Sequence, residues 1–310
     1  MYYIGIDFGG TNIAAGIVDE NFNIVHKDST PTNADRPWEE IIDDMVMISN
    51  RMMKHEGIDI SEIKYIGIGI PGKIDRGSGV IIYSNNLNFN NVPIVERIQK
   101  QLDLPVYIEN DANAAALGEA YSGATKDASD SIMITLGTGI GGGIIIGKKI
   151  YAGYNGNAAE LGHTVIVVDG EMCSCGRPGC WEAYASATAL IRQTKEAAKN
   201  NPDSILAQLA RDGVNGKTVF DAKEKGCPAA QQVFDNYIKY LGAGITDMIN
   251  IFRPEILVIG GGISKQGDNL LIPLKKYIAE NVYGGTIDTE IRIAQLGNDA
   301  GIVGAAALGI

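Results

Sequence analysis

The feature that most constrains the fold is a strand–turn–strand pattern that occurs twice in the chain. Residues 3–18 read YIGIDFGGTNIAAGIV, and residues 131–146 read SIMITLGTGIGGGIII. In each copy an apolar run leads into a turn of small residues that contains a threonine, and a second apolar run follows. The repeat predicts an internal duplication, with two α/β halves that each present a phosphate-binding hairpin to a nucleotide between them.

The rest of the chain reads as alternating helices and strands. Strands are expected at residues 23–27, 65–70, 106–109 and 256–259. Helices are expected at residues 38–54, 92–101, 112–121, 185–200, 204–212, 218–225, 229–252 and 299–308. With 310 residues, of which 45% are apolar, the chain is long enough for two α/β lobes.

The acidic balance of the chain argues against nucleic acid as a partner. Lys and Arg total 26 and Asp and Glu total 37, so the net charge is −11. One nucleotide remains compatible with this charge, because backbone amides can hold phosphate inside an acidic protein. The N-terminus lacks a basic start followed by a long apolar run, and no stretch of about 18 apolar residues occurs. We therefore expect a cytoplasmic protein without a membrane partner.

The Gly-rich turns are the first candidate binding elements. One such turn would be weak evidence, since glycine is common in hairpins for structural reasons alone. This chain has two, and a glycine triplet at residues 260–262 follows a third strand. Glycine lets backbone N–H groups approach phosphate oxygens, and the hydroxyl groups of Thr11 and Thr138 add donors. Asp7, at the end of its strand, is a candidate to hold Mg²⁺ through water.

The dipeptide Asn110-Asp111 has two interpretations. Asn and Asp both cap helices, and an Ala-rich helix is expected to begin here. Alternatively, Asp111 is a general base that accepts the proton of a substrate hydroxyl while that hydroxyl attacks a γ-phosphate. The second interpretation places a carboxylate at the carboxyl end of a strand, where α/β folds bind ligands.

The strongest local signal is a set of one histidine and three cysteines with the spacing H-x9-C-x-C-x4-C: His163, Cys173, Cys175 and Cys180. One imidazole and three thiolates suit tetrahedral Zn²⁺, and four protein ligands make a closed structural site. The alternative is a group of buried free cysteines, which three cysteines within eight residues make less attractive. Cys227 lies outside the set, and His26 and His55 carry no signal.

Two carboxylates flank this metal-binding loop. Glu160 lies three residues before His163, and Glu182 lies two residues after Cys180. Exposed glutamates usually have no function, but a metal ion would fix both backbone segments here. Both carboxylates could then be aimed at one polar ligand, and acceptors that bridge adjacent hydroxyls are what sugar recognition requires.

Together these residues resemble the ROK family of sugar kinases and repressors, within the actin-like ATPase fold. The resemblance spans nearly the whole chain, and within the family it points toward bacterial glucokinases. The stretches that carry it are IGIDFGGTN (4–12), GIGIPG (67–72), SNNLNFNNVP (84–93), IENDANAAALGE (108–119), TLGTGIGGG (135–143), AELGH (159–163), CSCGRPGCWE (173–182) and GGGIS (260–264).

The resemblance implies a role for each candidate residue. Asp111 would be the catalytic base, and His163 would bind zinc with one ring nitrogen and the sugar with the other. The sugar would be bound by Gly72, Asn86, Asn110, Asp111, Glu160, His163 and Glu182. ATP and Mg²⁺ would be bound by Asp7, Gly9, Gly10, Thr11, Asn12, Thr138, Gly139, Gly261 and Gly262. The family usually has Lys or Asn after the GGT turn; this chain has Asn12, so no cationic phosphate contact is expected at this position.

The implied architecture is a duplicated, ribonuclease H-like α/β fold with two lobes, and the final helix returns to the first lobe. We expect a small lobe of residues 1–118 plus 297–310, and a large lobe of residues 119–296 that contains the zinc loop. The resemblance further implies a homodimer or homotetramer.

Three alternatives remain open at this point. The substrate of the kinase could be N-acetylmannosamine or fructose instead of glucose, since discrimination depends on one or two hydroxyl groups. A ROK repressor is disfavoured, because the first hairpin begins at Tyr2 and leaves no room for a preceding DNA-binding domain. A filament or chaperone ATPase of the same fold would not explain the zinc loop and its two flanking carboxylates.

Overall fold

Each copy of the repeated pattern forms a hairpin. Strand β1 (Tyr2–Phe8) pairs antiparallel with β2 (Asn12–Asp19), so that Phe8 lies opposite Ile13 across the Gly-rich turn. Strands β9 (Ser131–Leu136) and β10 (Ile140–Ile146) are likewise neighbours in a second sheet. The duplication expected from the sequence is therefore confirmed.

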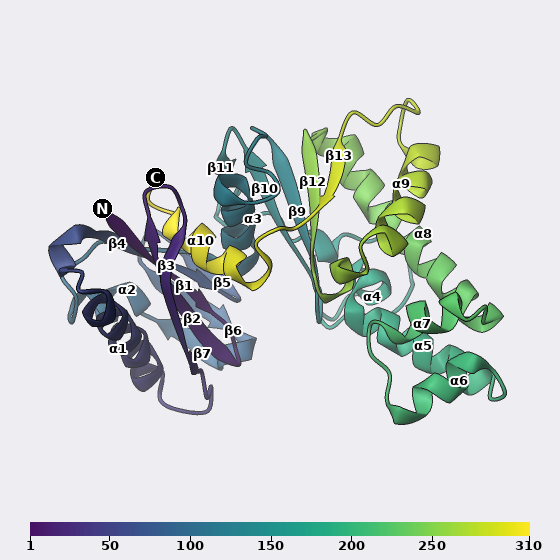
Figure 1. Cartoon of the computed structure of the whole chain (residues 1–310), viewed down its shortest axis with the longest axis horizontal. Coiled ribbons are helices and arrows are strands. Elements are labelled where there is room, and N and C mark those ends of the chain that lie inside the picture. Colours follow the sequence, from purple (N-terminus) through teal and green to yellow (C-terminus); the bar gives the residue numbers. More distant parts are fainter. The chain divides into compact units, whose positions relative to one another are not determined.

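The two five-stranded sheets have the same topology (Figure 1). The first has the order β3-β2-β1-β4-β8, and the second has the order β11-β10-β9-β12-β13. In each, the hairpin continues into a third strand on one side, and later strands join on the other. The remaining bounds are β3 (Ile24–Pro31), β4 (Ile63–Ile70), β8 (Val106–Asn110), β11 (Lys149–Ile150), β12 (Ile256–Gly261) and β13 (Glu290–Ile293).

The computed structural model describes residues 1–310, which divide into two units. Unit 1 comprises residues 1–133, 143–159 and 294–310, and unit 2 comprises residues 134–142 and 160–293. The division passes through strands β9 and β10. The lobe boundaries expected from the sequence stay a prediction. No helix is both long enough and apolar enough to cross a membrane.

Unit 1 contains the first sheet, its helices and a small antiparallel sheet. The helices are α1 (Trp38–Glu56), α2 (Ile94–Gln99), α3 (Asp111–Ser122) and α10 (Ala300–Ala306). The small sheet consists of β5 (Lys73–Asp75), β6 (Val80–Ser84) and β7 (Phe89–Val92). Isoleucines at helical spacing on α1, among them Ile41 and Ile48, are fully buried against the apolar side chains of the first sheet.

Helix α10 lies directly against β1 and α3, and glycines make this close approach possible. A Cβ on Gly5 would overlap the carbonyl oxygen of Ile302, and one on Gly304 would overlap the carbonyl oxygen of Ala114. The end of α3 is fixed by the fully buried Glu119, whose carboxylate accepts hydrogen bonds from three backbone N–H groups, of Ala124, Gln295 and Leu296. The final helix thus returns to unit 1, as the resemblance implied.

Unit 2 packs its helices around the second sheet and the cysteine-rich loop. They are α4 (Glu182–Ala185), α5 (Ala187–Asn200), α6 (Ile205–Leu209), α7 (Thr218–Glu224), α8 (Pro228–Phe252) and α9 (Asp268–Asn281). Helix α9 packs along α8 (Figure 1). The predicted helix at 185–200 begins instead at Ala187, because Ser186 is extended and caps the N-terminus of α5.

The sequence reading missed several elements. Helix α9 was not predicted, and it contains Pro273, a residue that normally signals the end of a helix. Strand β13 and the small sheet β5–β6–β7 were also not predicted. The helix expected at 92–101 is shorter, since Val92 ends strand β7 and Pro93 precedes the first helical residue.

Candidate functional site

Three parallel strands of unit 1 end at the same edge of the first sheet. Asp7 on β1 pairs in register with Gly69 on β4, and Gly69 pairs with Glu109 on β8. The next residue on β8, Asn110, is the last of its strand, and Asp111 opens helix α3. The register therefore brings Asp7 and Asp111, which are far apart in sequence, to one sheet edge, where open α/β sheets bind ligands.

In the turn between β8 and α3, Asn110 and Asp111 take different positions, which bears on the two roles considered for this dipeptide. Asn110 is the N-cap, and its side-chain oxygen accepts hydrogen bonds from Ala112 N (3.0 Å) and Asn113 N (3.2 Å). Asp111 is the first helical residue, and its carboxylate accepts one further bond from Ala112 N at 2.9 Å. Because Asn110 already caps the helix, the Asp111 side chain is not required for that role.

Both carboxylates of this edge hold their protons more tightly than usual. Burial raises the pKa of Asp111 above its ordinary value. Burial, and after it the charge of Asp111, raises the pKa of Asp7 from 3.8 to about 6. Such a pair attracts a cation or a hydrogen-bond donor, and raised pKa values in an acid–base site are typical of catalytic groups.

The first Gly-rich turn lies beside the loop that contains Asn86. The Gly9 N–H donates to the carbonyl oxygen of Asn12 (3.0 Å), which closes the turn, and the Thr11 side chain is exposed at its tip. A Cβ on Gly10 would lie 3.0 Å from the carbonyl oxygen of Asn86, so the two backbones are in close contact. Gly72 has a φ of +111°, and a Cβ there would overlap the backbone of strand β6.

In unit 2 the second Gly-rich turn lies beside the glycine triplet. The Gly137 N–H donates to the carbonyl oxygen of Gly139 (3.0 Å), and Thr138 is exposed between them. Gly261 has a φ of +85°, and a Cβ there would overlap the backbone of Leu136, directly before this turn. Gly262 is exposed and has open space where a Cβ would point. These four predicted nucleotide contacts are thus brought together.

The structure also brings the four predicted metal ligands together. The ligand atoms of His163, Cys173, Cys175 and Cys180 all lie within 4.8 Å of one another. The sulfur atoms of Cys175 and Cys180 are 3.6 Å apart, and Cys173 Sγ lies 3.7 Å from His163 Nδ1. A tetrahedral zinc ion with Zn–S bonds of about 2.3 Å requires ligand separations of this size. The donor set therefore fits Zn²⁺, with Nδ1 as the histidine ligand.

Glu182 connects this metal-binding loop to the second Gly-rich turn. One carboxylate oxygen accepts hydrogen bonds from Ser174 Oγ (3.0 Å) and Cys173 Sγ (3.5 Å), and the other accepts from Ile140 N at 3.0 Å. Between Cys180 and Glu182, the fully buried Trp181 donates its indole N–H to the carbonyl oxygen of Tyr240. The loop is therefore anchored in the core of unit 2 directly before Glu182.

Glu160 and His163 lie at the two ends of one 3₁₀ turn. The His163 N–H donates to the carbonyl oxygen of Glu160 at 3.1 Å, so this turn ties the backbone of Glu160 to a residue whose side chain lies in the cysteine set. The residue before Glu160, Ala159, has a φ of +69°, which is unusual for a residue with a Cβ. Backbone of this kind often marks a site where geometry is fixed for function.

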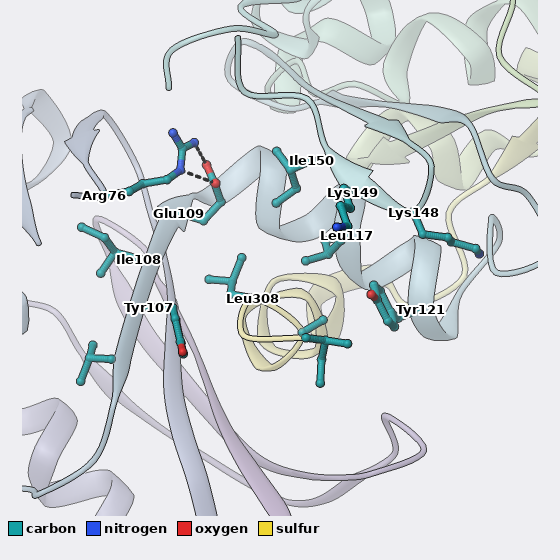
Figure 2. Close-up of a pocket in the computed structure, with 13 residues that line it drawn as sticks. Arg76, Tyr107, Ile108, Glu109, Leu117, Tyr121, Lys148, Lys149, Ile150 and Leu308 are labelled. Atoms are coloured by element: carbon teal, nitrogen blue, oxygen red, sulfur yellow. Dashed lines mark hydrogen bonds and ion pairs between the residues drawn. The ribbon is translucent and has the colours of Figure 1, made fainter. Parts of the chain in front are cut away.

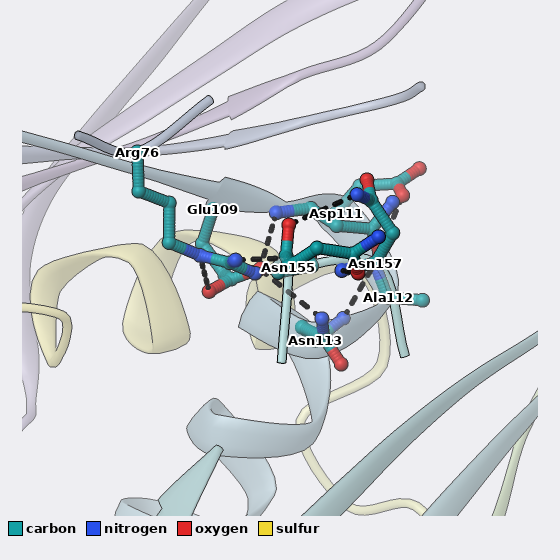
Figure 3. Close-up of polar contacts among 9 residues, drawn as sticks. Arg76, Glu109, Asp111, Ala112, Asn113, Asn155 and Asn157 are labelled. Atoms are coloured by element: carbon teal, nitrogen blue, oxygen red, sulfur yellow. Dashed lines mark hydrogen bonds and ion pairs between the residues drawn. The ribbon is translucent and has the colours of Figure 1, made fainter. Parts of the chain in front are cut away.

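The sequence reading missed an ion pair next to Asp111. The buried carboxylate of Glu109 makes a two-pronged contact with the guanidinium of Arg76, and Asn113 of α3 donates to the same carboxylate (Figure 3). The sequence pattern places Glu109 only at the end of a predicted strand. The available signal was a charged residue inside an otherwise apolar strand, which requires a partner when buried.

A pocket with a volume of about 320 Å³ also lies in unit 1 (Figure 2). Its lining includes Arg76, Tyr107, Glu109, Tyr121 and Lys149. None of the residues predicted to bind sugar, nucleotide or metal lines it. The Arg76–Glu109 ion pair forms part of its lining.

Comparison with known protein families agrees with this geometry. Residues 3–310 match the model of the ROK family. The chain belongs to the ROK family. The resemblance read from the motifs is thereby confirmed, and the chain has the α/β, actin-like ATPase fold of this family.

Relatives of this ROK protein include enzymes and regulators. It is 41% identical to a glucokinase of Streptomyces coelicolor over 315 residues, which cover 98% of this chain and 96% of the relative. A crystal structure of a ROK family glucokinase from Streptomyces griseus, in complex with glucose and AMPPNP, superimposes with a TM-score of 0.82, at 39% identity and 99% coverage of both chains. A xylose repressor of Bacillus subtilis is 32% identical over 98% of this chain and 75% of the repressor.

Proposed function

We propose that this protein is an ATP-dependent glucokinase, which transfers the γ-phosphoryl group of ATP to the 6-hydroxyl of glucose. The observation that carries the proposal is the partly buried Asp111 carboxylate at the edge of the first sheet, beside Asp7 and the first Gly-rich turn. The identity to glucokinases such as that of Streptomyces coelicolor supports the choice of reaction and of sugar.

Asp111 acts as the general base. Its carboxylate takes the proton from the 6-hydroxyl of glucose as the oxygen attacks the γ-phosphorus of ATP. Burial raises the pKa of this group, which makes it a stronger base than an exposed aspartate. Asn110 caps α3 and so holds the base at the helix N-terminus, and its side chain also contacts the sugar.

The proposed sugar ligands come from five residues besides Asn110 and Asp111. Gly72 and Asn86 contribute from the loops at the edge of the first sheet, and Glu160, His163 and Glu182 contribute from the cysteine-rich region. With Nδ1 of His163 facing Cys173, Nε2 remains to donate to a sugar hydroxyl. Three polar groups on one anchored loop favour a single arrangement of ring hydroxyls.

ATP is bound by the two Gly-rich turns and the glycine triplet. Backbone N–H groups and the hydroxyls of Thr11 and Thr138 contact the phosphates. The full set is Asp7, Gly9, Gly10, Thr11, Asn12, Thr138, Gly139, Gly261 and Gly262. The Mg²⁺ that accompanies ATP would neutralise phosphate charge, and Asp7 is the residue that would hold it.

The cysteine-rich loop holds one structural zinc ion through His163, Cys173, Cys175 and Cys180. The zinc has no part in phosphoryl transfer, because four protein ligands leave no open position. It fixes the backbone from which Glu182 and His163 reach the sugar. We also propose a homodimer or homotetramer, which light scattering of the purified protein would test.

A coupled assay with ATP and a panel of hexoses tests the proposed function. We expect glucose to give the highest kcat/KM. A missing or inverted hydroxyl leaves a buried group unpaired, which costs about 1–3 kcal/mol, or roughly 5- to 150-fold in kcat/KM. A tenfold preference for N-acetylmannosamine or fructose would overturn the glucose assignment and leave the kinase assignment standing. Absence of turnover with every hexose would overturn both.

A further inference from the structure

We propose that Arg76 and Glu109 form a positioning pair, which fixes the turn that carries Asp111 and couples it to residues 151–159, the segment that leads into Glu160. This inference rests on the proposed kinase function. It assigns a role to two residues that contact neither sugar nor nucleotide in that proposal.

The Glu109 carboxylate accepts four hydrogen bonds. One oxygen accepts from Arg76 Nη2, from Asn110 N at 2.7 Å and from Asn113 Nδ2 at 3.1 Å; the other accepts from Arg76 Nε at 2.6 Å. The Glu109 side chain is only 5% exposed, so this charge requires its partners. Glu109 therefore holds the backbone N–H of the N-cap residue and the first turn of α3 at once (Figure 3).

The hydrogen bonding of Asn113 supports a role for Glu109 in fixing the first turn of helix α3. Asn113 is buried inside helix α3, and its side-chain oxygen has no hydrogen-bond partner. An unsatisfied buried carbonyl is costly, and an apolar residue would avoid the cost. The hydrogen bond from Asn113 Nδ2 to Glu109 is the contact that accounts for a polar residue at this position.

Arg76 extends the pair to a second segment. Its Nη1 donates to the carbonyl oxygen of Gly156 at 2.9 Å, while Nε and Nη2 hold Glu109. Around Gly156, Asn157 donates its backbone N–H to Asn155 Oδ1 (3.2 Å) and its side-chain amide to Asn155 O (3.0 Å), so the tip of the segment is folded on itself. A Cβ on Gly156, whose φ is +80°, would overlap Arg76 Nη1.

The planar guanidinium of Arg76 thus joins two parts of unit 1. One is the turn that carries Asp111, and the other is the segment 151–159, which directly precedes the proposed sugar ligand Glu160. Lysine cannot replace the guanidinium, because a single ammonium group lacks the fork of three donors used here. If the pair positions Asp111, its loss lowers kcat. If it also positions the segment before Glu160, the KM for glucose rises, while the KM for ATP is unchanged.

Arg76→Lys is the first test, with turnover measured per folded molecule. We expect kcat to fall by roughly 10- to 100-fold, the cost typical of a misplaced catalytic group. Arg97→Lys is the matched control, since Arg97 makes a similar two-pronged pair with Asp43 between α2 and α1. The control should lose some thermal stability and keep its kcat.

Chemical rescue separates positioning from folding. Arg76→Ala should recover kcat on addition of methylguanidine, which restores the fork, and should not recover it with methylammonium. Gly156→Ala should raise the KM for glucose, because its Cβ displaces Arg76. Gly147→Ala is its control, since Gly147 has a similar φ of +58° and open space at the Cβ.

The outcomes distinguish this inference from the proposed function. Wild-type protein without hexose phosphorylation would overturn the proposed function. Active wild-type protein with an unchanged kcat in folded Arg76→Lys would overturn the positioning pair alone. Equal rescue by methylguanidine and methylammonium would also overturn it.

A different observation carries a second inference. Two of the three histidines of the chain, His26 on β3 and His55 near the end of α1, lie on either side of Glu56. Their Nδ1 atoms are 2.9 and 2.8 Å from the same carboxylate oxygen, and all three ligand atoms lie within 4.8 Å of one another. The three side chains are 24, 67 and 28% exposed, in the order His26, His55 and Glu56.

We infer that this trio is a surface site for a divalent transition metal ion. Two imidazoles and a carboxylate are the donors that Zn²⁺, Ni²⁺ and Cu²⁺ accept, and water completes the coordination on the exposed side. A bound ion would bridge edge strand β3 to the end of α1. The site is separate from the His163 set, to which none of these residues belongs.

Titration with Ni²⁺, after the cysteine-rich site has been loaded with zinc, tests this site. We expect one additional ion per chain, monitored by calorimetry, and a rise in thermal stability on binding. His55→Ala and His26→Ala should abolish the additional ion, and the exposed Glu40→Ala on the same helix should not. Equal Ni²⁺ binding by wild type and His55→Ala would overturn the inference.

Discussion

The Glu182 carboxylate accepts a hydrogen bond from the backbone N–H of Ile140, 3.0 Å away. Ile140 follows the second Gly-rich turn, and the other oxygen of Glu182 accepts a hydrogen bond from Ser174, between the proposed metal ligands Cys173 and Cys175. Under the proposed function, one side chain connects the zinc loop, a sugar contact and a nucleotide turn. A substitution in the zinc loop, at the sugar contact or in the nucleotide turn should therefore alter the other two.

Gly139→Ala should raise the KM for glucose. A Cβ at this position would overlap the Glu182 carboxylate, so Glu182 must leave its hydrogen bond with Ile140. Gly137→Ala, two residues earlier in the same turn, meets nothing within 4 Å and serves as the control. Steady-state kinetics of both variants test this prediction. If Gly139→Ala and Gly137→Ala have the same KM for glucose, the position of Glu182 does not depend on this turn.

Removal of a metal ligand should weaken sugar binding and the fold together. Purified wild-type protein should contain about one zinc ion per chain, and Cys175→Ala should lose it, along with stability and glucose affinity. Cys227→Ala, at a buried cysteine outside the set, should keep the zinc. Metal analysis and glucose titration measure both effects. Zinc-free wild-type protein with full activity would contradict the structural role of the metal.

Asp111→Asn should abolish most turnover without unfolding helix α3. General-base catalysis is worth about 10²- to 10⁴-fold, and kcat should fall within that range. The helix should persist, because Asn110 supplies the cap. Circular dichroism and glucose binding provide the controls. A kcat near the wild-type value would leave Asp111 without a catalytic role.

Asp7→Asn should stabilise the ligand-free protein at pH 7 while lowering its activity. The pKa of Asp7 is about 6 in the folded state and 3.8 ordinarily, so the folded state binds this proton more tightly. The associated stabilisation is complete below pH 3.8 and is lost as the pH rises through about 6. At pH 7 the ionised carboxylate therefore costs on the order of 3 kcal/mol, which asparagine removes.

Urea unfolding without nucleotide, at pH 7 and pH 4, measures this effect. The gain from Asp7→Asn should be present at pH 7 and nearly absent at pH 4. Asp59→Asn is a control with the opposite expected sign. Hydrogen bonds from Ser61 lower the pKa of Asp59, so this substitution should reduce the stability of the protein at pH 7. A gain from Asp7→Asn that is independent of pH would show that burial of the charge is not its cause.

The sequence by itself determined the duplicated hairpins, the clustered set of one histidine and three cysteines, and the acid at the start of α3. These features are local: the spacing between the cysteines already limits how far apart their sulfur atoms can lie, and a strand–turn–strand pattern folds on itself. The pair Asn110-Asp111 also predicts a helix cap, and the structure assigns the N-cap position to Asn110.

Only the tertiary structure decided which distant residues meet. Arg76 and Glu109 are 33 positions apart, and the contact between Glu182 and Ile140 spans 42. Such contacts depend on strand register and on the packing of loops, which no local pattern encodes. The raised pKa values of Asp7 and Asp111 have the same origin, because burial is a property of the packed chain and the two carboxylates become neighbours only when β1 and β8 join one sheet.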